Sequence, residues 1–154
     1  MTSLQTNFSR DLPGLPADRR DQIVRRIARD EHVRRSTAER WFEETLKFLD
    51  ACANEGAPVS PPRRVDRAWH VFILFTRDYR SYCTARHGVL IHHDPMEKPN
   101  SEAYERAYLW VEEHYGALPR RIWPPPASRC SGGWGFGGGC VAGGCGGGGC
   151  GGGG

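Results

Sequence analysis

Apolar residues first recur at helical spacing between residues 17 and 33. Ile23, Val24 and Ile27 share one face of a helical wheel, and arginines occupy the opposite face. Pro16 followed by Ala17-Asp18 is typical of the first turn of a helix. This stretch therefore predicts a helix from residue 17 to about residue 33.

A second apolar stripe follows the sequence Ser36-Thr37-Ala38-Glu39, which matches a capping box. In that arrangement the Ser36 side chain caps the helix and Glu39 reaches back to the backbone of Ser36. We expect this helix to continue to about Asn54, where Gly56 and Pro58 would end it. Its predicted buried residues are Ala38, Trp41, Phe42, Thr45, Leu46, Phe48, Leu49 and Cys52.

The third and fourth apolar stretches lie after an extended connection rich in proline. The third predicts one helix from about Val65 to Gly88, and the fourth predicts a helix from about Asn100 to Tyr115, ended by Gly116. Between them, residues 89–93 are too few for another helix and predict either an extended return segment or a short turn closed by Asp94-Pro95. A stiff strap, Ile122-Trp123-Pro124-Pro125-Pro126, should cross the bundle. The third helix should face the core with Val65, Ala68, Trp69, Phe72, Thr76, Tyr79 and Cys83.

These elements predict an all-α fold, a small bundle of about four helices with a proline-rich strap. The chain of 154 residues is long enough for one core. We assign residues 1–15 to a flexible lead-in, 16–127 to the helical domain and 128–154 to a low-complexity tail. The tail is rich in glycine and cysteine, and we expect it to be disordered because it has too few apolar side chains to offset the entropy of ordering.

Composition excludes some classes of function and leaves others open. The formal net charge of +3 admits an acidic or nucleic-acid partner without requiring one. No stretch is apolar enough to span a membrane, and residues 1–10 lack the features of a secretion signal. We therefore expect a cytoplasmic protein with reduced thiols and no membrane partner.

The candidate chemistry lies on the third predicted helix and the segment that follows it. Asp66 and His70 are one turn apart on a strip at the margin of the core. A chain reversal at Gly88 can return His92 or His93 to the same place. Two imidazoles and one carboxylate suit zinc or another divalent transition metal. Because neighbouring residues of an extended segment point to opposite sides, we expect only one of this pair to face inward, and we favour His93.

The same residues also fit a hydrogen-bonded cluster that only stabilises the fold, and the sequence does not decide between the two. Cys83 lies about 20 Å from His70 along an unbroken helix, so we interpret it as a core thiol rather than a fourth ligand. Cys83 and His87 could form a nucleophilic pair, but no oxyanion hole or orienting group accompanies them. We rank this possibility below both others.

Two further regions suggest partners. Arg25, Arg26 and Arg29 belong to a basic run that could contact nucleic acid, although interleaved acidic residues can pair with these arginines at helical spacing. In the tail, the thiols of Cys130, Cys140, Cys145 and Cys150 could wrap around a soft metal ion. Their spacing does not match a zinc knuckle or ribbon, and we favour a low-complexity tail with incidental cysteines.

One stretch of the sequence resembles a motif of a known protein family. It runs from Pro61 to His70, includes Val65-Asp66 and Trp69-His70, and is followed by Tyr79 and Cys83. This pattern resembles the core motif of the glycine-rich domain-containing proteins, and the Ile91-to-Pro95 extension resembles their bacterial branch. The resemblance implies an α-helical domain, some of whose plant relatives have RNA-binding character. It does not imply a catalytic activity.

Together these observations favour a small, non-enzymatic binding module with a candidate Asp/His metal site. The competing hypothesis is a nucleic-acid or protein adaptor that uses the arginine-rich helix and the aromatic residues of the glycine tail. A third hypothesis, ranked lower, is a hydrolase that activates water on a metal held by Asp66, His70 and His93.

Overall fold

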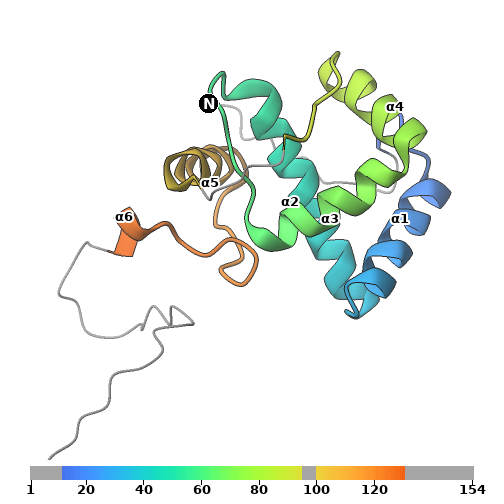
Figure 1. Cartoon of the computed structure of the whole chain (residues 1–154), viewed down its shortest axis with the longest axis horizontal. Coiled ribbons are helices and arrows are strands. Elements are labelled where there is room, and N and C mark those ends of the chain that lie inside the picture. Colours follow the sequence, from blue (N-terminus) through green and yellow to red (C-terminus); the bar gives the residue numbers. More distant parts are fainter. Residues whose placement is uncertain (1–11, 95–99, 131–154) are drawn as a thin grey trace, which may run out of the picture.

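The protein is a helical bundle in which α2 is the central element (Figure 1). The computed structural model describes residues 12–94 and 100–130, and this part of the chain contains no β-strand apart from an isolated bridge between Leu12 and Leu15. The expected all-α fold is confirmed. The helices are α1 (Ala17–Asp30), α2 (Arg35–Asn54), α3 (Arg63–Leu74), α4 (Thr76–His87), α5 (Ser101–Tyr115) and the short α6 (Ala127–Cys130).

Helix α2 contacts α1, α3 and α5, and its apolar stripe forms the centre of the core. Phe42, Phe48 and Leu49 on this helix are completely buried, as the sequence pattern predicted. Phe42 meets the ring of Phe72 on α3 edge to face, and this pair joins the two helices at the middle of the bundle. The burial of these rings supplies much of the apolar stabilisation of the fold.

The predicted capping box at Ser36 is wrong. Helix α2 begins one residue earlier, at Arg35, and its N-cap residue, Arg34, makes no side-chain capping hydrogen bond. Helix α1 also ends earlier than predicted, at Asp30. Between the two helices the chain passes through His32, which adopts a positive φ of 54°. Because Ser36 lies inside the first turn of α2 and not before it, its side chain is not at the N-cap position.

The prediction of one long helix from Val65 to Gly88 is also wrong. The helix breaks at Phe75, whose φ and ψ of −84° and 61° separate α3 from α4. No glycine or proline marks this position. The turn directs both Tyr79 and Tyr82 of α4 onto Phe72, with ring centroids 5.0 and 5.7 Å away. The separation of about 20 Å between Cys83 and His70, which assumed one unbroken helix, therefore does not apply.

The return segment and α5 follow the predicted pattern, whereas the short helix α6 was not predicted and overlaps the start of the expected tail. Gly88 ends α4 in the left-handed conformation, and residues 90–94 have no regular secondary structure. The Asn100 side chain caps α5 by accepting a hydrogen bond from the Ala103 amide, 3.0 Å away. Gly116, with a φ of 82°, follows the last turn of α5.

The segment after α5 closes the bundle between α2 and α5. The Trp123 side chain is completely buried, and its indole nitrogen donates a hydrogen bond to the Glu44 carboxylate, 2.8 Å away. Lys47 pairs with the same carboxylate at 2.7 Å. The buried charge of Glu44 is therefore compensated, and the strap belongs to the core.

A second buried carboxylate, Asp50, joins α2 to α4 and α5. Arg86 donates two hydrogen bonds to it, at 3.0 and 2.7 Å, and the Tyr115 hydroxyl donates another. His87 lies 3.5 Å from the same carboxylate, and its side chain is only 3% exposed. Burial lowers the pKa of His87. The negative charge of Asp50 partly opposes this shift, and the positive charge of Arg86 reinforces it.

We expect Trp123→Ala to destabilise the whole domain by about 3–5 kcal/mol, because it removes a large buried ring and leaves a cavity. Urea unfolding followed by circular dichroism measures this change. Arg121→Ala, at an exposed position of the same segment, is the control and should change stability little. Equal effects of the two changes would show that the strap is not part of the core.

The buried His87 should make folding stability depend on pH. Because the pKa of His87 is lower in the folded protein, the unfolded chain binds a proton more readily. The contribution of neutral His87 to the unfolding free energy is therefore fully present above about pH 6.5, the usual pKa of histidine. It is lost as the pH falls from there through the pKa of His87 in the folded protein. We expect His87→Gln to flatten this part of the pH profile of unfolding free energy. His32→Asn, on the exposed turn, should leave the profile as it is in the parent protein.

Candidate metal centre

Helix α3 places Asp66 and His70 one turn apart, with Asp66 in its first turn. The Nδ1 atom of His70 lies 2.6 Å from the backbone carbonyl oxygen of Asp66. A carbonyl oxygen only accepts hydrogen bonds, so Nδ1 carries the proton in the neutral ring and the lone pair is on Nε2. This tautomer, held by a backbone carbonyl, is the one that commonly binds metals through Nε2.

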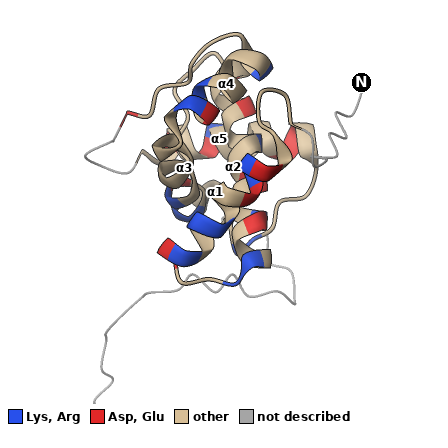
Figure 2. Ribbon diagram, turned by 90° about the vertical axis from the view of Figure 1, so that its right-hand side faces the viewer, with Lys and Arg blue, Asp and Glu red and all other residues tan. Residues whose placement is uncertain are grey.

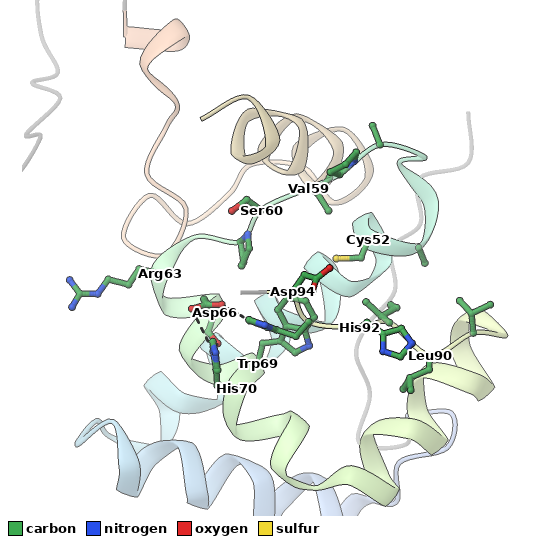
Figure 3. A pocket seen from close by; sticks show the side chains of 17 residues that line it. Cys52, Val59, Ser60, Arg63, Asp66, Trp69, His70, Leu90, His92 and Asp94 are labelled. Atoms are coloured by element: carbon green, nitrogen blue, oxygen red, sulfur yellow. Dashed lines mark hydrogen bonds and ion pairs between the residues drawn. The ribbon is translucent and has the colours of Figure 1, made fainter. Parts of the chain in front are cut away.

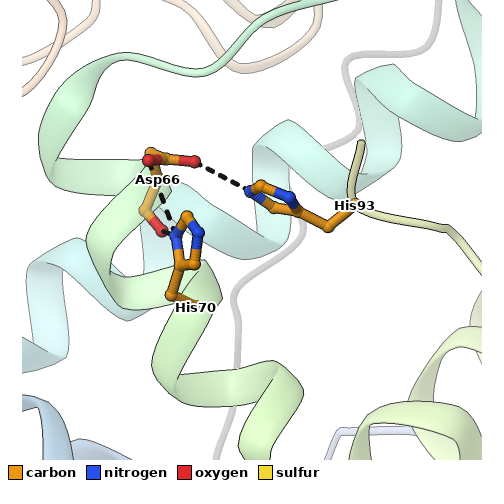
Figure 4. A group of neighbouring side chains, drawn as sticks. All are labelled: Asp66, His70 and His93. Atoms are coloured by element: carbon orange, nitrogen blue, oxygen red, sulfur yellow. Dashed lines mark hydrogen bonds and ion pairs between the residues drawn. The ribbon is translucent and has the colours of Figure 1, made fainter. Parts of the chain in front are cut away.

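His93 completes the cluster from the return segment (Figure 4). Its Nε2 atom is 3.0 Å from Oδ1 of Asp66, and its ring centroid is 4.3 Å from that of His70. One candidate ligand atom from each of the three residues lies within 4.8 Å of the others. The structure brings together Asp66, His70 and His93, whereas His92 is exposed and outside the cluster.

A hydrogen-bond chain from α3 through α4 explains why His93 reaches Asp66. The indole nitrogen of Trp69 donates to the Tyr79 hydroxyl at 2.9 Å, and this hydroxyl donates to the carbonyl of Ile91 at 2.7 Å. Burial raises the pKa of Tyr79, so the hydroxyl keeps the proton that it donates. Ile91 is thereby anchored two residues before His93, and the His93 ring packs on Trp69 with centroids 4.4 Å apart.

The donor set fits a divalent transition metal. Ligand atoms of a tetrahedral zinc site are about 3.3 Å apart when the bonds are about 2.0–2.1 Å long, so small side-chain movements suffice to form one. Two imidazoles and one carboxylate leave at least one coordination position for water or another ligand. The side chain of His93 is 13% exposed and that of His70 is 55% exposed, so the cluster is open to solvent on the His70 side.

The cluster lies at one end of a cleft of about 960 Å³ (Figure 3). The cleft is bordered by the end of α2, the connection to α3, the first two turns of α3 and the return segment. This size is within the range of ligand sites for small molecules. His92, although outside the cluster, also lines the cleft. The other lining residues are Cys52, Ala53, Ala57, Pro58, Val59, Ser60, Pro61, Arg63, Trp69, Val89, Leu90, Ile91 and Asp94.

Cys83 is not part of the cluster and is not an activated nucleophile. It is completely buried, and its thiol interacts with the Tyr79 hydroxyl and the backbone of Ile91. Burial raises the pKa of this thiol, which opposes formation of a thiolate. His87, the expected partner, lies beside Asp50 instead. Cys83 therefore helps to hold Ile91, and with it the return segment, next to Tyr79.

The arginines proposed to contact nucleic acid are paired with acidic residues on α1. Arg25 pairs with Asp21 at 2.7 Å, whereas Arg26 and Arg29 both pair with Asp30. Figure 2 shows acidic and basic residues close together around α1. This pairing lowers the net positive charge that a phosphate backbone would meet.

The structure does not test the candidate thiol site of the tail. Cys140, Cys145 and Cys150 lie outside the described residues, and Cys130 is the last described residue, at the end of α6. Within the described part of the chain, no helix combines the length and apolar content needed to cross a membrane.

The sequence did not indicate the buried Asp50 cluster or the walls of the cleft. Asp50 occupies a position that a helical wheel assigns to the edge of the apolar face, and its partners come from α4 and α5. The cleft combines two stretches that are separated in sequence, residues 52–70 and 89–94. Val89 and Leu90, an apolar pair directly after a glycine, are a local signal that could have indicated it.

The comparison with known protein families matches the helical part of the chain. Residues 18–111 match the model of a family described as UCP032817-like, a description that states no activity. No curated protein and no solved structure matches the chain. The matched range includes Asp66, His70 and His93. Because it covers more than half of the chain, the protein belongs to the UCP032817-like family.

Proposed function

We propose that the protein is a binding module that holds one divalent transition metal ion between α3 and the return segment, and that zinc is the preferred ion. Asp66, His70 and His93 are the protein ligands. The observation that carries this proposal is the convergence of their donor atoms, within 4.8 Å of one another, at the end of a cleft.

The hydrogen bonding of the cluster favours metal binding over a purely structural role. A stabilising polar cluster is usually buried and has its hydrogen-bonding groups satisfied. Here the His70 side chain is 55% exposed, and its Nε2 atom has no hydrogen-bond partner among the described residues. A free lone pair beside a carboxylate and a second imidazole is what a cation requires.

Other hypotheses have less support. The ion pairs on α1 weaken the adaptor hypothesis based on Arg25, Arg26 and Arg29. The resemblance to the glycine-rich domain-containing proteins is compatible with a binding role and gives no support to a hydrolase. Metal binding without assigned catalysis is therefore the function that the site supports best.

Purified protein should bind about one zinc or cobalt(II) ion per chain, measured by elemental analysis and by titration with cobalt(II). We expect His70→Ala to weaken binding by about 100-fold or more, since loss of an outer-shell partner alone costs 10–100-fold. The exposure of His70 should let this variant fold normally.

Two controls locate the site. His92→Ala changes the adjacent, exposed histidine and should keep full metal content. A chain in which Cys140, Cys145 and Cys150 are serines should also keep it. If metal content followed the tail cysteines rather than His70, or if carefully prepared protein bound no metal, the proposed site would be rejected.

The anchor of His93 gives a separate prediction. Tyr79→Phe removes the hydroxyl between Trp69 and Ile91, so we expect faster amide hydrogen exchange at residues 91–94 and a roughly tenfold weaker cobalt affinity. Tyr108→Phe, a buried tyrosine of α5 outside the cleft, is the matched control. Unchanged exchange and affinity in Tyr79→Phe would show that the hydrogen-bond chain does not position His93.

A further inference from the structure

Two exposed apolar side chains lie side by side in sequence on the wall of the metal-binding cleft. Among the described residues, four large hydrophobic side chains are exposed: Leu74, Val89, Leu90 and Leu109. Val89 is 58% exposed and Leu90 is 39% exposed, and both line the cleft. Exposed apolar surface next to a polar site often marks the place where a ligand binds.

Further apolar side chains line the cleft beside the polar residues Ser60, His92 and Asp94. Pro58, Val59 and Pro61 line it from the connection before α3, and Ile91 lines it from the return segment. Cys52 contributes a thiol whose pKa is raised by burial to about 12, so it remains neutral and does not compete as a thiolate for the metal. In the view of Figure 3, Leu90 and Cys52 lie on one side of the cleft, and Asp66 and His70 lie on the other.

The charges of the cleft favour an anionic group at the metal. Its lining contains one arginine, Arg63, and two carboxylates, Asp66 and Asp94. A bound divalent cation would make the positive charges outnumber the negative ones. The open coordination position is then suited to an oxygen anion, which also matches the ligand preference of zinc.

We propose that this cleft binds a small carboxylic acid with an apolar body. The carboxylate occupies the open position of the metal held by Asp66, His70 and His93, and the hydrocarbon lies along Val89 and Leu90. The cleft volume of about 960 Å³ accommodates such a molecule. This inference depends on the proposed metal site, but it concerns a different set of residues.

The test is a titration of the cobalt(II)-loaded full-length protein with acetate, butanoate, hexanoate and octanoate. Coordination is followed through the visible absorption of cobalt, and affinity is measured by calorimetry. We expect octanoate to bind most tightly, with about two- to fourfold tighter binding for each added methylene that the cleft covers.

Variants distinguish the cleft wall from the metal. Val89→Ser/Leu90→Ser should keep one cobalt per chain and the affinity for acetate, but it should lose at least about tenfold in affinity for octanoate. Leu109→Ser, at a similarly exposed leucine on α5, should retain the affinity for octanoate. Because these side chains are exposed, the variants should fold.

Three results would overturn the proposal. The first is equal affinity for all four acids in protein that has bound cobalt, and the second is unchanged octanoate binding in Val89→Ser/Leu90→Ser. The third is equally tight octanoate binding to metal-free protein, which would show that the carboxylate does not need the ion. Failure to take up cobalt at all is a different outcome, because it rejects the metal site itself and with it this inference.

Discussion

The hydrogen-bond chain from Trp69 through Tyr79 to Ile91 is the interaction on which the candidate site depends. It joins three segments: α3, α4 and the return segment. It can form only because the helix breaks at Phe75, which turns α4 back toward α3. A straight helix would carry Tyr79 and everything after it away from Trp69. The break and the hydrogen-bond chain together bring His93 to Asp66.

The motif that suggested a family resemblance is one connected structural unit. Val65 is buried in the core, while Asp66 and His70 project from the margin of the same helix. Trp69 supports the His93 ring and donates to Tyr79, and the Cys83 thiol contacts Tyr79 and the backbone of Ile91. Each side chain of the motif therefore either belongs to the cluster, supports it or fixes the helix that carries it.

The sequence predicted what depends on local periodicity and missed what depends on distant contacts. The apolar stripes located α1, α2 and α5 because helical spacing is a local property. Alternation in an extended segment indicated for the same reason that only one of His92 and His93 faces inward, but it did not determine which one. The break at Phe75 is marked by neither glycine nor proline, and the contacts of Tyr79 and Tyr82 with Phe72 across it join residues of two separate helices. The residues around Asp50 come together only when three helices are assembled.

The carboxylate clusters around Asp50 and Asp66 differ in their burial and in how completely their hydrogen-bonding groups are satisfied. Asp50 is buried and its oxygens receive several charged and neutral donors, so it has little capacity for a ligand. Asp66 is partly exposed, lies in a cleft and faces two imidazoles, one of which has an unpartnered nitrogen. Removing water from a charge is costly unless partners replace it, and Asp50 has those partners within the fold. At Asp66 the set of partners is less complete, and this difference is the reason for proposing that a cation binds there and not at Asp50.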